Sequence, residues 1–152
     1  MRERRRFLQL VGAGAVTLGA LPILQACGGG GQGGQSPASG PVPAGNVSAV
    51  PVGTLEIVGG QPVILGRDAA GLYAMSAICT HAGCSMVDSG TVDGNGAYCA
   101  CHGSQFDRNG NPVSGPARSP LDHYRVDLAA DGTITVQAGN IVAESTRTAV
   151  PA

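Results

Sequence analysis

Two short blocks of cysteine and histidine lie in the middle of this 152-residue chain. Residues 79–84 read Cys-Thr-His-Ala-Gly-Cys, and residues 99–104 read Cys-Ala-Cys-His-Gly-Ser. Thiolate and imidazole are side chains that hold zinc and iron in proteins. Each block also has a glycine, Gly83 or Gly103, which lets the backbone approach a bulky inorganic group closely. The pattern predicts a metal site built from both blocks.

The residues alone leave more than one kind of site open. A tetrahedral zinc takes four ligands, which two cysteines and two histidines would supply. Zinc would leave the second cysteine of each block, Cys84 or Cys101, without a role. A domain held only by disulfides would use all four of these cysteines but would leave both histidines unexplained. A structural zinc module and a disulfide-stapled domain are therefore alternatives to a redox centre.

The two blocks closely resemble the Rieske iron–sulfur family over residues 79–120. The resemblance implies one [2Fe–2S] cluster per chain, with two cysteines on one iron and two histidines on the other. The implied ligands are Cys79, His81, Cys99 and His102. It also implies the family's disulfide between the two loops, here joining Cys84 and Cys101, and a β-rich fold around them.

Further residues match the family's surroundings of the cluster. Gly115-Pro116-Ala117 is similar to the proline loop that covers the cluster's other side. In high-potential members a serine after the second block and a tyrosine two residues later donate hydrogen bonds to the cluster's sulfurs. Ser104 matches the serine, whereas Phe106 stands at the tyrosine position. One hydroxyl is therefore missing, and we expect a lower reduction potential than in members with both donors.

The second cysteine pair indicates the kind of Rieske protein. Rieske components of aromatic-ring oxygenases generally lack this pair, so the chain resembles the energy-transducing kind. Three hosts fit that kind: a stand-alone lipid-anchored electron carrier, the iron–sulfur subunit of a quinol–cytochrome c oxidoreductase, and the small subunit of another exported oxidoreductase such as the arsenite oxidase type. The implied redox partners are a quinol with cytochrome b, or a c-type cytochrome.

The elements that position the two blocks read as short strands separated by turn residues. The expected hairpins turn at Ala69–Gly71, at Asn109-Gly110 and at Asp131-Gly132. No stretch after residue 26 has a convincing helical period. We therefore predict an all-β Rieske domain, a small antiparallel sandwich or barrel-like fold, over residues 46–142. Its cluster-binding part is expected at about residues 78–121, and a loose tail at residues 143–152.

The N-terminal segment reads as an export signal. Arg4-Arg5-Arg6-Phe7-Leu8-Gln9 resembles a twin-arginine motif, and residues 7–26 carry no charge. Leu24-Gln25-Ala26-Cys27 resembles a bacterial lipobox, which implies cleavage after residue 26 and a lipid on Cys27. Alternatively, residues 7–26 stay as an uncleaved membrane anchor, since about 20 apolar residues can span a bilayer. Both interpretations place the domain outside the cell's cytoplasm, tethered to the outer face of the cytoplasmic membrane.

Composition defines a linker and excludes several functions. Residues 27–45 hold eight glycines and three prolines, which predicts a flexible linker between tether and domain. Charged residues make up 12% of the chain and the net charge is −1, so no basic surface for nucleic acid is expected. No nucleophile–base pair or phosphate loop is visible. We therefore expect electron transfer rather than catalysis by this chain alone.

The export interpretation predicts two separable defects. Replacing both Arg4 and Arg5 with Lys should leave the precursor in the cytoplasm, because the twin-arginine route reads the arginine pair rather than charge alone. Cys27→Ser should release a soluble exported form if the lipid is the anchor. Cell fractionation and immunoblotting measure both. A Cys27→Ser chain that stays on the membrane would favour the uncleaved anchor.

Overall fold

The β-type runs of the sequence form ten strands in the computed structural model, which describes residues 36–151. The strands are β1 (Gly40–Asn46), β2 (Leu55–Ile57), β3 (Val63–Asp68), β4 (Gly71–Ser76), β5 (Gly90–Asp93), β6 (Gly96–Cys99), β7 (Ser104–Phe106), β8 (Pro112–Ser114), β9 (His123–Leu128) and β10 (Thr133–Val142). A 3₁₀ turn, Val47–Ala49, follows β1. Within the described range, no helix is long and apolar enough to cross a membrane.

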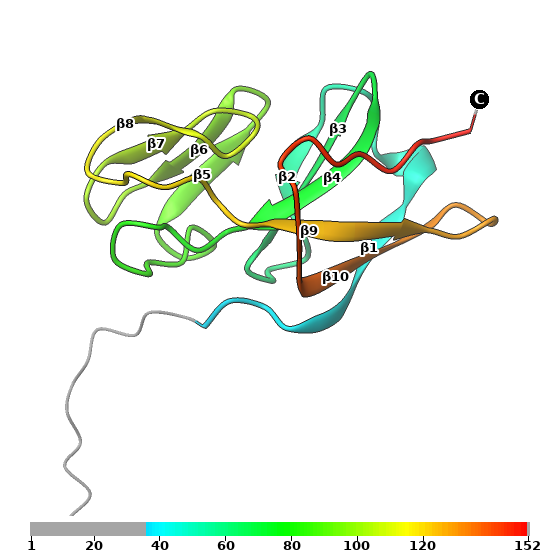
Figure 1. The fold of residues 1–152 in the computed structure, drawn as a ribbon, viewed down its shortest axis with the longest axis horizontal. Coiled ribbons are helices and arrows are strands. Elements are labelled where there is room, and N and C mark those ends of the chain that lie inside the picture. The colour runs from blue at the N-terminus through cyan, green and yellow to red at the C-terminus, as the bar shows by residue number, and fades with distance from the viewer. Residues whose placement is uncertain (1–35, 152) are drawn as a thin grey trace, which may run out of the picture. The chain divides into compact units, whose positions relative to one another are not determined.

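The strands form two antiparallel sheets, as Figure 1 shows. The larger sheet has the order β1-β10-β9-β4-β3-β2 and is called here the base sheet. The smaller sheet has the order β5-β6-β7-β8 and is called the site sheet, because it carries the second cysteine–histidine block. The all-β antiparallel fold expected from the sequence is therefore confirmed.

All three expected hairpins are present. β3 pairs with β4, β7 with β8, and β9 with β10, each antiparallel and around the predicted turn. At the second turn, Asp107 accepts hydrogen bonds from the backbone N–H groups of Asn109 and Asn111, at 2.8 and 2.9 Å. Gly110 has a φ of +78°, a conformation that glycine adopts without strain. Local turn chemistry therefore accounts for these hairpins.

The expected linker extends too far towards the C-terminus. Residues 40–45 were included in it, but Gly40–Asn46 forms β1, which pairs with β10 at the edge of the base sheet. Proline has no backbone N–H to donate, and it is tolerated here because one side of an edge strand makes no hydrogen bonds to a neighbouring strand. Val42 is buried and packs in the core of the base sheet. The export motif at Arg4 and Arg5, the lipobox at Cys27 and linker residues 27–35 lie outside the described residues.

The expectation of a loose tail at residues 143–152 is wrong for most of that segment. Thr148 and Leu72 exchange two backbone hydrogen bonds of 2.9 and 2.8 Å, so the tail pairs with β4. Arg147 forms an ion pair with Asp68 at 2.6 Å, and Val150 packs against the base core. These contacts reach residues far away in the sequence, which is why composition did not reveal them.

β3 and β4 connect two hydrophobic clusters. The base cluster includes Val63, Leu65, Leu72 and Ala74, and the site cluster includes Ile64, Tyr73, Met75 and both free cysteines. Successive residues of a strand point to opposite faces, so the hairpin contributes alternately to each cluster. Every residue of β4 is buried. The base and the site therefore share one central hairpin.

Candidate metal centre

The first ligand loop, residues 79–84, directly follows β4 and the short connection after it. Its ends are tied together, since the N–H of Cys79 donates to the carbonyl of Cys84 at 2.8 Å. Within the loop, the N–H of Gly83 donates to the carbonyl of Cys79 at 2.9 Å. Gly83 has a φ of +74°, which a residue with a side chain rarely adopts. The glycine is thus needed to turn the loop back on its cysteine.

The second ligand loop, residues 99–104, joins β6 to β7 and repeats this geometry. The N–H of Gly103 donates to the carbonyl of Cys99 at 3.0 Å, and Gly103 has a φ of +79°. In both loops, therefore, the glycine four residues after the cysteine closes the turn. The two blocks found in the sequence are matched structural units.

The structure separates the four implied ligands into an inner and an outer pair. The side chains of Cys79 and Cys99 lie in the site cluster, and these residues are only 2% and 1% exposed. His81 and His102 are exposed, and their ring centroids lie 4.7 Å apart. This arrangement brings two thiols and two imidazoles from separate loops to one edge of the domain.

The implied disulfide is present and joins the two ligand loops. Cys84 and Cys101 are bonded, with 6.6 Å between their Cα atoms. The sulfurs of Cys84, Cys99 and Cys101 all lie within 4.8 Å of one another, so the disulfide lies against a buried thiol. The sulfurs of Cys84 and Cys101 form the disulfide, so neither is available to bind a metal. The cross-link holds the loops together without using an implied ligand.

Burial makes the Cys99 thiol of the inner pair hard to ionise unless a cation lies beside it. Burial raises the pKa of the Cys99 thiol, and the adjacent Cys79 thiol raises that pKa further. Nearby backbone N–H groups of Cys101 and His102 act in the opposite direction but do not outweigh burial. Two neighbouring buried thiolates need a cation beside them, because metals bind the deprotonated form. The donor set, two thiols and two imidazoles, fits a [2Fe–2S] cluster of the Rieske type.

A third loop, containing Gly115-Pro116-Ala117, packs against both ligand loops. Gly115 has a φ of +84°, and a Cβ there would collide with the backbone of Gly103 and Ser104. The N–H of Ala117 donates to the Ser104 hydroxyl at 3.1 Å. The predicted proline loop therefore lies against the second ligand loop.

The proline loop is also fastened to the first ligand loop. The hydroxyl of Thr80 donates to the carbonyl of Ser119 at 2.7 Å. This contact was not predictable from the sequence, because a side-chain contact across 39 positions leaves no local pattern. All three loops at this edge of the domain are thus connected to one another.

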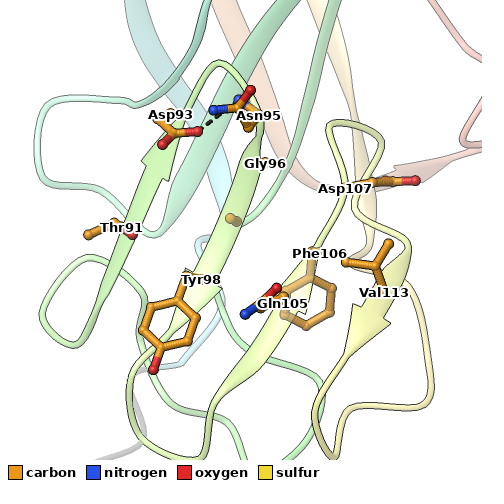
Figure 2. Close-up of a pocket in the computed structure, with 10 residues that line it drawn as sticks. Thr91, Asp93, Asn95, Gly96, Tyr98, Gln105, Phe106, Asp107 and Val113 are labelled. Carbon is orange, nitrogen blue, oxygen red and sulfur yellow. Dashed lines mark hydrogen bonds between the residues drawn. The ribbon is translucent and has the colours of Figure 1, made fainter.

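Ser104 and Phe106 both point to the inner side of the site sheet. They alternate along β7 with exposed Gln105, and both are buried. In Figure 2, Thr91, Tyr98 and Gln105 lie on three successive strands, and the strand register places them in one row across the outer face. This face has a shallow hollow of about 390 Å³. Since the Ser104 oxygen already accepts from Ala117, its hydroxyl proton is available to a second partner.

Comparisons with known proteins agree with this geometry. Residues 40–125 match the family described as "Rieske [2Fe-2S] domain". The chain is 35% identical to the cytochrome b6-f complex iron-sulfur subunit of Prochlorococcus marinus (strain MIT 9211) and 36% identical to that of Synechococcus sp. (strain CC9605). Each alignment covers 88% of this chain and 84% of the relative.

A solved structure shares the fold. In the complex of reduced oxygenase and oxidized ferredoxin in carbazole 1,9a-dioxygenase, one chain superposes with a TM-score of 0.50 at 29% identity. The superposition covers 70% of this chain and 99% of that chain.

The positions of Ser104 and Phe106 predict opposite effects on reduction potential. Phe106→Tyr should raise the midpoint potential by tens of millivolts, on a scale of about 59 mV per tenfold for one electron, by adding a donor near a ligand sulfur. Ser104→Ala should lower it by removing a donor. Protein-film voltammetry of both variants measures the shifts. An unchanged potential in Phe106→Tyr would mean that this position does not reach a sulfur.

Proposed function

The chain belongs to the Rieske [2Fe–2S] family, and on this premise we propose that it is the iron–sulfur subunit of a membrane quinol–cytochrome oxidoreductase. As a Rieske protein it is a one-electron carrier. The host complex is proposed because the relatives named as cytochrome b6-f subunits align over 84% of their length, well beyond the ligand loops. The observation that carries the proposal is the pair of exposed imidazoles on the same two loops as two buried thiols, with the Cys84–Cys101 disulfide joining those loops.

We propose that Cys79 and Cys99 hold one iron and that His81 and His102 hold the other. When bound, a cluster with this ligand set supplies a one-electron couple at roughly −150 to +300 mV. The two cysteines keep their sulfurs away from water within the site cluster. Met86 and Phe106 pack in the same cluster and help to exclude water from the two cysteines.

The two histidines have a different task because they are exposed. Each imidazole has two ring nitrogens, so one would bind the iron and the other would stay available to exchange a hydrogen bond with a redox partner. An exposed imidazole can be contacted directly by a redox partner, whereas the buried thiols cannot. This arrangement suits the oxidation of a quinol, which releases protons along with electrons.

The proposed location and partners follow from the same family. The described residues form the domain, and the export signal and tether expected at residues 1–27 would place it on the outer face of the cytoplasmic membrane. There it would accept electrons from a quinol bound beside cytochrome b and pass them to a c-type cytochrome. A stand-alone tethered carrier and a subunit of an arsenite oxidase type are the rival hosts.

Loss of either proposed histidine ligand should abolish the Rieske signature. His102→Ala and His81→Cys each remove an imidazole from a defined iron position, so the anisotropic electron paramagnetic resonance spectrum of the reduced protein should disappear. Glu56→Gln is the control, since this exposed residue of β2 lies outside both blocks and should leave the spectrum intact. A normal spectrum in His102→Ala would show that the ligand assignment is wrong, and a colourless wild type would favour zinc.

The host complex is tested separately on the native protein. The tagged full chain, solubilised from membranes in a mild detergent, should migrate with b-type and c-type haem on a native gel. The same fraction should reduce cytochrome c when a quinol is added, and His102→Ala should abolish that reduction. A cluster-loaded chain that migrates without haem would instead indicate a stand-alone carrier.

A further inference from the structure

Arg147 of the C-terminal tail joins the base sheet to the site sheet. Its Nε donates to Asp68 Oδ2 at 2.6 Å, at the turn between β3 and β4. Its Nη2 donates to Asn109 Oδ1 at 2.8 Å, in the turn between β7 and β8. The guanidinium lies over the ring of Tyr73, 4.1 Å from the ring centroid. One side chain therefore contacts both sheets and the central hairpin.

The Arg147 contact differs from an ordinary surface ion pair. Only 13% of its side chain is exposed, and a further nitrogen, Nη1, donates to the carbonyls of Glu144 and Thr146 at 2.6 and 3.0 Å. Burial raises the pKa of Asp68, but the hydrogen bonds from Arg147, Ala70 and Gly71 outweigh burial and lower it overall. Asp68 is therefore ionised at neutral pH, and the pair is charge-assisted.

The turn between β7 and β8 is held from several directions. The carbonyl of Asn109 accepts from Nε2 of His123 on β9 at 2.8 Å, and the hydroxyl of Tyr73 donates to the carbonyl of Arg108 at 3.0 Å. His123 itself is buried and stacks against Tyr73. The side chain of Asn111 donates to Glu144 of the tail at 2.7 Å. The base and the tail thus hold this turn together.

From this turn, the two strands lead directly to the metal centre. β7 is only three residues long and begins at Ser104, directly after Gly103 of the second ligand loop. Ser104 therefore lies at the end of the hairpin opposite the turn. β8 is equally short, and Gly115 directly after it packs on Gly103 and Ser104. The strands pair at Gln105–Ser114 and Phe106–Pro112, so the hairpin connects the position of its turn to its other end. The orientation of Ser104 therefore depends on where the turn is held.

We propose that Arg147 is a positioning residue for the metal centre, holding the β7–β8 turn through Asn109 so that the Ser104 hydroxyl is aimed at the site. The proposal rests on the cluster site proposed above and assigns a redox-tuning role to the tail. Residues that orient the groups around a metal tune its chemistry without touching it.

Two variants test the contact without changing net charge. Arg147→Lys keeps the positive charge but loses the planar fork, and Asn109→Leu removes the acceptor at similar volume. Both should lower the midpoint potential of the cluster-loaded full chain, towards that of Ser104→Ala. Both should also raise hydrogen–deuterium exchange at residues 104–117 about tenfold, as expected for losing a hydrogen bond to a charged group. Arg125→Lys is the matched control, because it alters an arginine–aspartate pair whose arginine side chain is 60% exposed.

The decisive measurement is a double-mutant cycle. If Arg147 acts through Ser104, Arg147→Lys should produce no further shift of potential in a Ser104→Ala background. An equal shift in both backgrounds would overturn the proposal, as would lower thermal stability with an unchanged potential. Absence of a Rieske spectrum in the wild type would instead contradict the proposed function. In that case, unchanged hydrogen–deuterium exchange at residues 104–117 in Arg147→Lys would still refute the positioning role of Arg147.

Discussion

Burial of β4 on both faces is the constraint on which the rest of the structure depends. Leu72 and Ala74 pack into the base cluster, while Tyr73 and Met75 pack into the site cluster. Neither cluster is complete without this strand, so the two halves of the domain cannot be stabilised independently. The two residues after β4, Ala77 and Ile78, are also buried, and the first ligand loop begins directly after them. Cys79 is therefore placed at the inner side of the site.

Around this shared strand, the loops at the site are held by contacts with one another rather than by a large sheet. The disulfide joins the two ligand loops, and Thr80 and Ser104 join each of them to the proline loop. The site sheet consists of strands of only three or four residues. Such short strands contribute few ladder hydrogen bonds, so cross-links and close glycine contacts have to define the geometry. Gly115 shows this, because no larger residue would fit against Gly103 and Ser104.

The parts of the structure that were predictable from the sequence depend on neighbours within about twenty positions. The Asn109-Gly110 and Asp131-Gly132 turns have local chemistry, and both cysteine–histidine blocks have a recognisable spacing. β1 was missed because its glycines and prolines resemble a linker, whereas its pairing partner is the distant β10. Arg147 and His123 were overlooked for the same reason, since their partners are remote in sequence. A pattern within one segment carries no information about such contacts.

The sequence distances of these contacts also bear on the order of folding. The disulfide closes a loop of 17 positions, whereas the Arg147–Asp68 pair spans 79 positions, and β1–β10 pairing joins Gly40 to Ala138. The entropy lost on closing a chain loop grows with its length, and long-range strand pairing is slow. The disulfide that joins the two ligand loops closes a shorter chain loop than the contacts of Arg147 and β1 do. Loop-closure entropy therefore favours the joining of the two ligand loops before the base sheet acquires its edge strand β1.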